Sequence, residues 1–226
     1  MQKDIEFKIE FISTAPFTIF KINNFYDEDL YRKISVQLPS LEQLQLYDLK
    51  IYNNKFYFSS DDDIYKKIIE NAPALKKLHN LVFSKSFMSF LYKNLYFKIL
   101  MARNNDLSSF INLLKIPKYK INEKLSNDNF YNLGIKPIIE YSYITNEGKV
   151  VPHTDNKTKL ISMLSYFPYC KKDSEYFELE KDLGTEFWFS KEKNYNNMHL
   201  KDSEQEKKFR KDSKLIYKTP FESKTL

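Results

Sequence analysis

The chain has 226 residues and a formal net charge of +6 at pH 7, and it is 42% hydrophobic, 16% aromatic and 29% charged. This length suits one domain with a sizeable core, and the composition excludes disordered, collagen-like and low-complexity proteins. No stretch provides the roughly 18 uncharged residues that a membrane-spanning helix needs, and acidic residues near the N-terminus do not fit a secretory signal. We therefore expect a cytoplasmic protein with one domain over residues 1–226 and no membrane contact.

The make-up of the positive charge argues against nucleic-acid binding. Arg32, Arg103 and Arg210 are the three arginines among 36 basic residues, and 30 acidic residues are interspersed with them. Proteins that read nucleic acids tend to gather arginine forks on one face. The single cysteine, Cys170, excludes an internal disulfide and a thiolate zinc cluster, so any metal would be held by His, Asp, Glu or Tyr.

Residues 1–135 are predicted to form a support region of strands and helices. Alternating apolar residues within the first 20 positions indicate one or two strands. Asp27 can cap a helix that ends at Pro39, and further apolar spacing predicts a helix from about residue 60 to Pro73, one or two helices over 74–101 and a short helix over 106–114. His79 lies on this helical pattern and is interpreted as a surface or hydrogen-bonded core histidine.

Residues 136–226 are predicted to contain short antiparallel strands. A hairpin is expected from a strand over 138–144, a turn at 146–148 and a return strand at 150–152, and further strands are expected over 160–167 and 184–189. Helices followed by such strands indicate an α+β chain whose β part is a jelly roll or a barrel.

The candidate chemistry lies in Pro152-His153-Thr154-Asp155. In an extended chain, residues two apart point to the same side, so His153 and Asp155 can present an imidazole and a carboxylate to one metal ion. The competing interpretation is that the two side chains hydrogen-bond each other at the end of a strand. The spacing alone does not decide between these interpretations.

Several pieces around this pair occur in an ordered series: Tyr143, His153-Thr154-Asp155, the run 159–168 with Tyr166, and Gly184-Thr185. This series resembles the core of the iron(II)- and 2-oxoglutarate-dependent oxygenases, in their prolyl-hydroxylase-like branch. The resemblance implies N-terminal helices packed on a double-stranded β-helix of the jelly-roll, cupin-like type. It also implies iron(II) as cofactor and 2-oxoglutarate as cosubstrate, with His153 and Asp155 as two metal ligands.

The resemblance further implies Tyr143 and Tyr166 as candidate hydroxyl donors to the distal carboxylate of 2-oxoglutarate, although both could equally be barrel core. By strand parity, Tyr166 is expected to face the barrel interior together with Ser162 and Leu164. Lys159 could add positive charge near the site, or it could simply be solvated.

The third ligand of the family, a later histidine followed by a basic residue, is not found in a convincing place. His199 and Arg210 have a suitable separation, but their polar surroundings are typical of a loop and an exposed helix. The alternative is that Leu226 is not the natural C-terminus and that the last strands of the barrel are missing.

The sequence thus predicts an iron(II)- and 2-oxoglutarate-dependent dioxygenase that hydroxylates a small-molecule or peptidyl substrate and releases succinate. The alternatives are a non-catalytic jelly-roll binding module, an inactive truncated homologue, and a lysine-based nucleic-acid binder. The substrate and the oligomeric state are not predicted.

Overall fold

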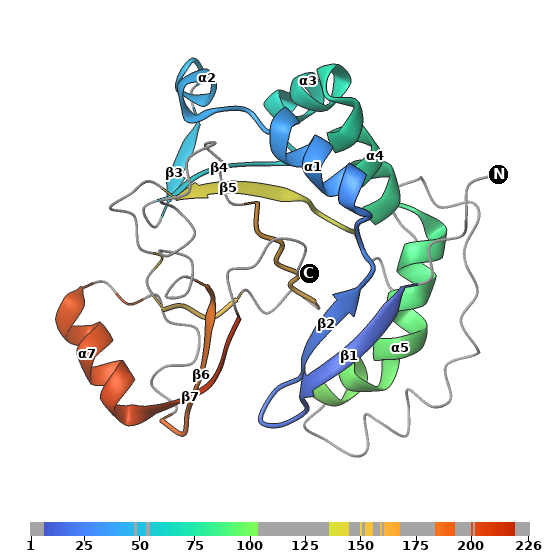
Figure 1. Cartoon of the computed structure of the whole chain (residues 1–226). Helices are drawn as coiled ribbons and strands as arrows, with labels where there is room; N and C mark the ends of the chain where they lie inside the picture. The colour runs from blue at the N-terminus through green and yellow to red at the C-terminus, as the bar shows by residue number, and fades with distance from the viewer. Residues whose placement is uncertain are drawn as a thin grey trace.

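The structure is a computed structural model. It describes residues 7–47, 49–52, 55–103, 136–144, 150, 152–155, 159, 161–167, 184–192, 200 and 202–219. These residues form an α+β fold in which helices accompany small antiparallel sheets (Figure 1).

The helices are α1 (Glu28–Gln37), α2 (Leu41–Gln45), α3 (Asp63–Asn71), α4 (Pro73–Val82), α5 (Lys85–Arg103) and α7 (Ser203–Asp212). The strands are β1 (Lys8–Ser13), β2 (Ile19–Asn23), β3 (Lys50–Tyr52), β4 (Lys55–Ser59), β5 (Glu140–Ile144), β6 (Glu186–Ser190) and β7 (Ser213–Lys218). Among the described residues the strands pair as β1-β2, as β3-β4-β5 and as β6-β7.

Helix α1 begins and ends where the sequence predicts. The Asp27 carboxylate accepts a 2.6 Å hydrogen bond from the backbone N–H of Leu30, which satisfies one of the free donors of the first turn. Leu30 and Ile34 are buried on the inner face of the helix. The expected change of helix at Pro73 is also confirmed, because α3 ends at Asn71 and Pro73 is the first residue of α4.

The pairing of β4 with β5 joins segments that lie about 80 residues apart in the sequence. Phe58 lies opposite Tyr141 and Phe56 lies opposite Tyr143, so these aromatic side chains share one face of the sheet. That face packs against the helices, since the ring of Tyr65 in α3 lies 6.5 Å from that of Phe58 and 5.8 Å from that of Tyr141. The main hydrophobic core therefore lies between this sheet and the helices (Figure 1).

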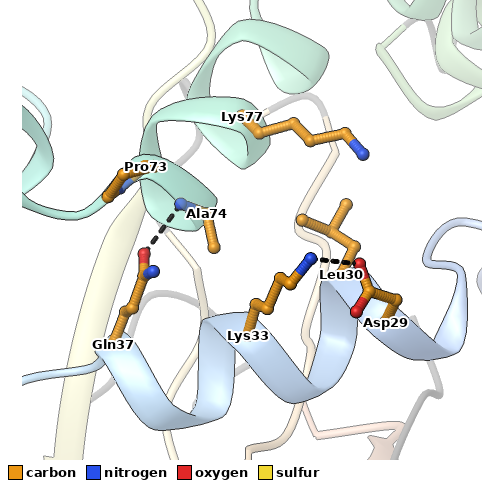
Figure 2. Close-up of a pocket in the computed structure, with 7 residues that line it drawn as sticks. All are labelled: Asp29, Leu30, Lys33, Gln37, Pro73, Ala74 and Lys77. Carbon is orange, nitrogen blue, oxygen red and sulfur yellow. Dashed lines mark hydrogen bonds and ion pairs between the residues drawn. The ribbon is translucent and has the colours of Figure 1, made fainter.

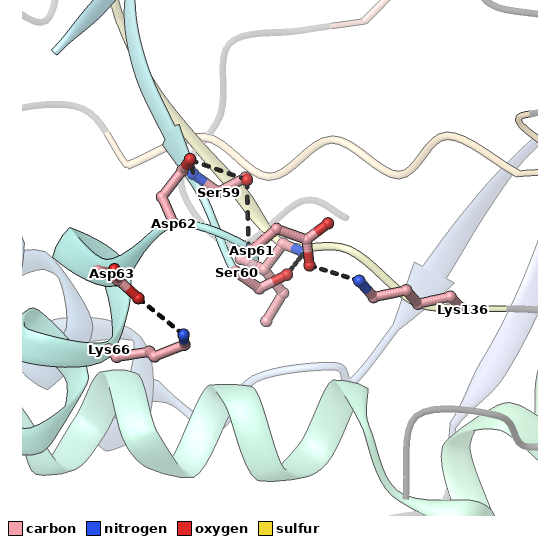
Figure 3. A network of polar contacts seen from close by, with 8 residues as sticks. Ser59, Ser60, Asp61, Asp62, Asp63, Lys66 and Lys136 are labelled. Carbon is pink, nitrogen blue, oxygen red and sulfur yellow. Dashed lines mark hydrogen bonds and ion pairs between the residues drawn. The ribbon is translucent and has the colours of Figure 1, made fainter. Parts of the chain in front are cut away.

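A turn between β4 and α3 fixes the end of this sheet. The Asp62 carboxylate accepts hydrogen bonds from the N–H and the hydroxyl of Ser59, and the ammonium of Lys136 lies 2.6 Å from the Asp61 carboxylate (Figure 3). The hydroxyl of Ser60 accepts a hydrogen bond from the N–H of Ile139, directly before β5. The acidic residues at this turn therefore anchor β5 and the start of α3.

Two further units complete the described fold. The strands β1 and β2 lie beside α5 (Figure 1), where the ring of Phe7 lies 5.2 Å from the rings of Phe87 and Phe90. The strands β6 and β7 pair with each other and carry α7 at one end, where Phe209 contacts Trp188. Strands β1, β2, β5 and β6 and helices α1, α3, α4 and α5 confirm elements that the sequence predicts.

Some expectations for the second half differ from the structure. A strand is expected over residues 160–167, but the described residues 161–167 form no strand. A return strand is expected over residues 150–152, but residues 150 and 152, which the structure describes, are not in a strand. Exposure still alternates over residues 161–164, as in a strand, because Ile161 and Met163 pack against the core while Ser162 and Leu164 are exposed. These residues have the alternating pattern but pair with none of the strands that the structure describes.

The described strands form no closed barrel, and the jelly roll therefore stays a prediction. The expected helix at 106–114 and the turn at 146–148 lie outside the described residues. Within the described part of the chain, no helix is both long enough and apolar enough to cross a membrane.

Two buried tyrosines of the core provide a test of this packing. The hydroxyl of Tyr141 is buried and has no hydrogen-bond partner among the described residues, whereas the hydroxyl of Tyr65 lies 2.9 Å from Nδ1 of His79. Removing an unsatisfied buried hydroxyl is favourable, and removing a hydrogen-bonded one costs the hydrogen bond. We expect Tyr141→Phe to raise the free energy of unfolding by about 1 kcal/mol and Tyr65→Phe to lower it by about 1 kcal/mol, measured by urea denaturation. Equal losses in both variants would contradict this assignment of the two hydroxyls.

Candidate metal centre

His153 and Asp155 lie on a short exposed segment that follows Pro152. The carbonyl of Pro152 accepts a 3.4 Å hydrogen bond from the N–H of Leu200, which ties this segment to the chain just before α7. Both side chains of the pair are exposed to solvent, and His153 is close enough to lower the pKa of Asp155 electrostatically. The structure therefore brings the two predicted ligands together at an accessible position.

The Asp155 carboxylate is held by two partners that the sequence did not identify. The ammonium of Lys159 lies 2.7 Å from Oδ1, and the hydroxyl of Ser162 donates a 2.6 Å hydrogen bond to Oδ2. Partial burial alone would raise the pKa of Asp155, but these two hydrogen bonds outweigh it and lower the pKa below its usual range. Asp155 is consequently an ionised carboxylate at neutral pH, the state that a metal ligand requires.

The charge of Lys159 also acts on a carboxylate of the sheet, that of Glu140. Glu140 in β5 accepts hydrogen bonds from Lys55 at 2.7 Å and from Ser142 at 2.7 Å. Partial burial would raise the pKa of Glu140, but these hydrogen bonds and the charges of Lys55 and Lys159 lower it. Glu140, Ser142 and Lys55 share the face of β4 and β5 that the helices leave open, and the charge of Lys159, the partner of Asp155, acts on this polar face.

Tyr143 lies on the opposite face of β5. Its ring stacks on Phe58 at 6.3 Å, and burial raises the pKa of its hydroxyl above the usual range for tyrosine. The structure thus places Tyr143 in the helix-covered core layer, and it does not bring this side chain to the polar face on which Glu140 lies. The proposed contact of Tyr143 with a cosubstrate stays a prediction.

Tyr166 belongs to a cluster of three hydroxyl groups. Its hydroxyl donates to Oγ1 of Thr185 at 2.6 Å, lies 2.8 Å from Oγ1 of Thr219 and accepts from the N–H of Thr185 at 3.1 Å. Gly184 has a φ of +129°, and a Cβ there would lie 1.9 Å from the carbonyl oxygen of Thr219. A glycine is therefore required for the close approach of β6 and β7 beside Tyr166.

These contacts bring together segments that the resemblance orders in sequence. Ser162 contacts Asp155, and Tyr166 contacts Thr185, directly before β6. Residues 161–167 therefore connect the candidate ligands His153 and Asp155 to β6. The backbone carbonyl of Tyr166 also accepts a 3.0 Å hydrogen bond from the hydroxyl of Tyr31 in α1. The sequence pattern could have suggested Thr185, because the Gly-Thr pair is part of the resemblance, but Thr219 carried no signal.

The described residues do not provide a third metal ligand. No group of three or more His, Cys, Asp or Glu side chains suited to a metal ion occurs among them, and His199 lies outside them. Arg210, the candidate clamp for the cosubstrate, is bound by Glu186 at 2.7 Å and by Glu206 at 2.8 Å. Its guanidinium also lies 4.9 Å from the centre of the Trp188 ring, so Arg210 braces α7 against β6.

A separate pocket of about 320 Å³ lies between α1 and α4 (Figure 2). Its lining residues are Asp29, Leu30, Lys33, Gln37, Pro73, Ala74 and Lys77. Several polar groups in it bind each other: Lys33 pairs with Asp29 at 2.6 Å, and Gln37 accepts a 2.7 Å hydrogen bond from the N–H of Ala74. None of the predicted site residues lines this pocket, which we interpret as the groove where two helices pack.

The donor chemistry of His153 and Asp155 fits two positions of a divalent ion such as iron(II). Imidazole and carboxylate are the ligand types of the 2-His-1-carboxylate sites that bind iron(II). The present partners of Asp155 are a cation and a hydroxyl donor, both of which a metal ion can replace at an exposed carboxylate. The pair therefore supplies two donors, and a third must come from outside the described residues.

Comparison with family models, with curated proteins and with solved structures finds no match to this chain. The resemblance to the oxygenases therefore depends on the residues quoted above and on their arrangement in space.

The brace around Arg210 gives a pH-dependent prediction. Partial burial would raise the pKa of Glu186, but hydrogen bonds from Arg210 and Trp188 lower it overall. Its ion pair therefore stabilises the fold above the unfolded-state pKa of about 4.3 and loses this effect as the pH falls through the lower folded-state pKa. We expect Glu186→Gln to lower the free energy of unfolding by about 1 kcal/mol at pH 7, with the difference vanishing in strong acid.

Fluorescence of Trp188, the single tryptophan of the chain, reports this unfolding directly. The exposed Glu204→Gln on α7 is the matched control and should change the free energy of unfolding little at any pH. A Glu186→Gln effect that is the same at pH 7 and in strong acid would contradict the ionic origin of this brace.

Proposed function

We propose that the chain is an iron(II)- and 2-oxoglutarate-dependent dioxygenase that hydroxylates a small-molecule or peptidyl substrate. The observation that supports this most is the exposed pair of His153 and ionised Asp155, joined through Ser162 to the segment that ends beside Gly184 and Thr185. A histidine and an aspartate at this spacing are common in protein sequences. The contact of this pair with the next two segments of the family pattern is the additional support.

His153 and Asp155 would hold the iron ion. The bound iron supplies the dioxygen chemistry that couples decarboxylation of 2-oxoglutarate to succinate with hydroxylation of an unactivated C–H bond. The protein contributes by keeping Asp155 ionised, through Lys159 and Ser162, and by holding His153 within electrostatic range of it. The remaining donor lies outside the described residues, and His199 is one candidate.

The three hydroxyl groups of Tyr166, Thr185 and Thr219 are proposed to bind the distal carboxylate of 2-oxoglutarate. They satisfy one another in the free protein, and hydroxyl groups rotate easily to serve a new acceptor. A carboxylate that accepts from such a cluster forms charge-assisted hydrogen bonds, which are stronger than those between neutral groups. Tyr166 is favoured over Tyr143 because it lies on the segment that also contacts Asp155.

One observation favours a second candidate, a non-catalytic binding module. Both oxygens of Asp155 and the hydroxyl of Tyr166 already have partners within the chain, as expected for residues with a purely structural role. In that case His153 and Asp155 would only stabilise the exposed segment, and the polar face of β4 and β5 would bind a partner without reaction.

The two candidates differ in their response to iron(II) and 2-oxoglutarate without oxygen. We expect the anaerobic complex to show a visible charge-transfer band that His153→Ala abolishes, because the imidazole is a direct ligand of the iron. Tyr166→Phe should retain the band but require about tenfold more 2-oxoglutarate for half of its intensity, since one hydrogen bond to a carboxylate is lost.

His199→Ala is the control that distinguishes the third-ligand hypotheses, because loss of the band would identify His199 as a ligand and retention would exclude it. A band that persists in His153→Ala, or no band in the unmodified chain, would refute the dioxygenase proposal in favour of the binding module. Circular dichroism of each variant confirms that the fold is retained.

A further inference from the structure

We propose that Lys159 is a built-in competitor of the metal ion, which occupies the Asp155 carboxylate in the metal-free protein and is displaced when a divalent cation binds. This inference rests on the proposed function, because it assumes that Asp155 is a metal ligand. It adds a role that the family resemblance does not assign to any residue: the affinity of the site for metal is set partly by a lysine of the same chain.

The contacts of Asp155 support this role. The ammonium of Lys159 lies 2.7 Å from Oδ1, and Ser162 occupies Oδ2 with a neutral hydroxyl. The lysine thus places one positive charge in direct contact with the carboxylate, whereas a divalent metal ion would place two positive charges there. An ammonium and a metal ion cannot neutralise the same carboxylate independently, since each raises the electrostatic cost of placing the other.

The exposure of the pair makes displacement easy. The side chains of Lys159 and Asp155 are 56% and 45% exposed, and ion pairs in such positions contribute little net stability. A displaced lysine also keeps an acidic neighbour, because Glu140 on the polar face already feels the charge of Lys159. The exposed ion pair therefore gives the Asp155 carboxylate a partner without blocking the site permanently.

Another ion pair of the chain serves as a matched control. Lys136 lies 2.6 Å from Asp61, with side chains that are 45% and 48% exposed, close to the values for Lys159 and Asp155. This pair fixes the turn between β4 and α3 and includes no histidine (Figure 3). Lys136→Met and Lys159→Met therefore remove the same charge and a similar ion pair, and only Lys159→Met removes it from the candidate metal centre.

The test is a titration with Mn²⁺ as the probe, in which the electron paramagnetic resonance signal of the free ion gives the dissociation constant. We expect Lys159→Met to bind Mn²⁺ about fivefold more tightly than the unmodified chain, because a competing charge near the carboxylate is removed. Lys136→Met should stay within about twofold of the unmodified chain, since Lys136 pairs with Asp61 and does not contact Asp155. Lys159→Arg keeps the positive charge and should therefore bind Mn²⁺ no more tightly than the unmodified chain.

The outcomes separate the competition by Lys159 from the proposed metal site itself. Equal affinity in Lys159→Met and the unmodified chain, or an equal gain in Lys136→Met, would overturn the competition while leaving the proposed metal site in place. If neither the unmodified chain nor Lys159→Met binds Mn²⁺, or if His153→Ala binds it as tightly, the proposed function fails and this inference fails with it. Because the readout is metal affinity, it does not require a substrate or an active enzyme.

Discussion

The antiparallel pairing of β4 with β5 separates the aromatic side chains of this region from its ionic ones. Phe56, Phe58, Tyr141 and Tyr143 share the face that the helices cover, while Lys55, Ser142 and Glu140 share the other face. A shift of one residue in this register would bury the charges and expose the aromatic rings, which makes the register strongly specified. The turn of Ser59 to Asp62 and its contacts to the segment before β5 fix the same register.

The candidate metal centre is held by ionic and hydroxyl groups. Lys159 and Ser162 bind the Asp155 carboxylate, and the charge of Lys159 also lowers the pKa of Glu140 on the polar face of the sheet. Along the next segment, residues 161–164 alternate between the core and the open side, and Tyr166 reaches Thr185 and Thr219. In our proposal, the ionised carboxylate and the imidazole bind the cation, and the hydroxyl cluster that includes Tyr166 binds the small carboxylate.

The features predicted from the sequence are those with local causes. The Asp27 cap, the apolar spacing of α1 and the proline between α3 and α4 act within a few residues, so the helices could be located. The strand β4 was missed because its partner β5 lies about 80 residues away. The strand expected at 160–167 is not formed by the described residues 161–167, because alternation does not ensure a partner. In the site, His153 and Asp155 form a recognisable motif, but nothing in the local sequence distinguishes Lys159 from the other lysines. Thr219 was also not predicted, because it reaches Tyr166 only through the pairing of β6 with β7.

The central claim is that His153 donates a nitrogen to a metal ion bound beside Asp155. Pulsed electron paramagnetic resonance of bound Mn²⁺, in protein with ¹⁵N-labelled histidine, measures this directly through the nitrogen hyperfine coupling. The account predicts that bound Mn²⁺ shows one coupled histidine nitrogen fewer in His153→Ala than in the unmodified chain. An unchanged number of coupled histidine nitrogens in His153→Ala, or bound Mn²⁺ that shows no histidine coupling in the unmodified chain, would contradict it.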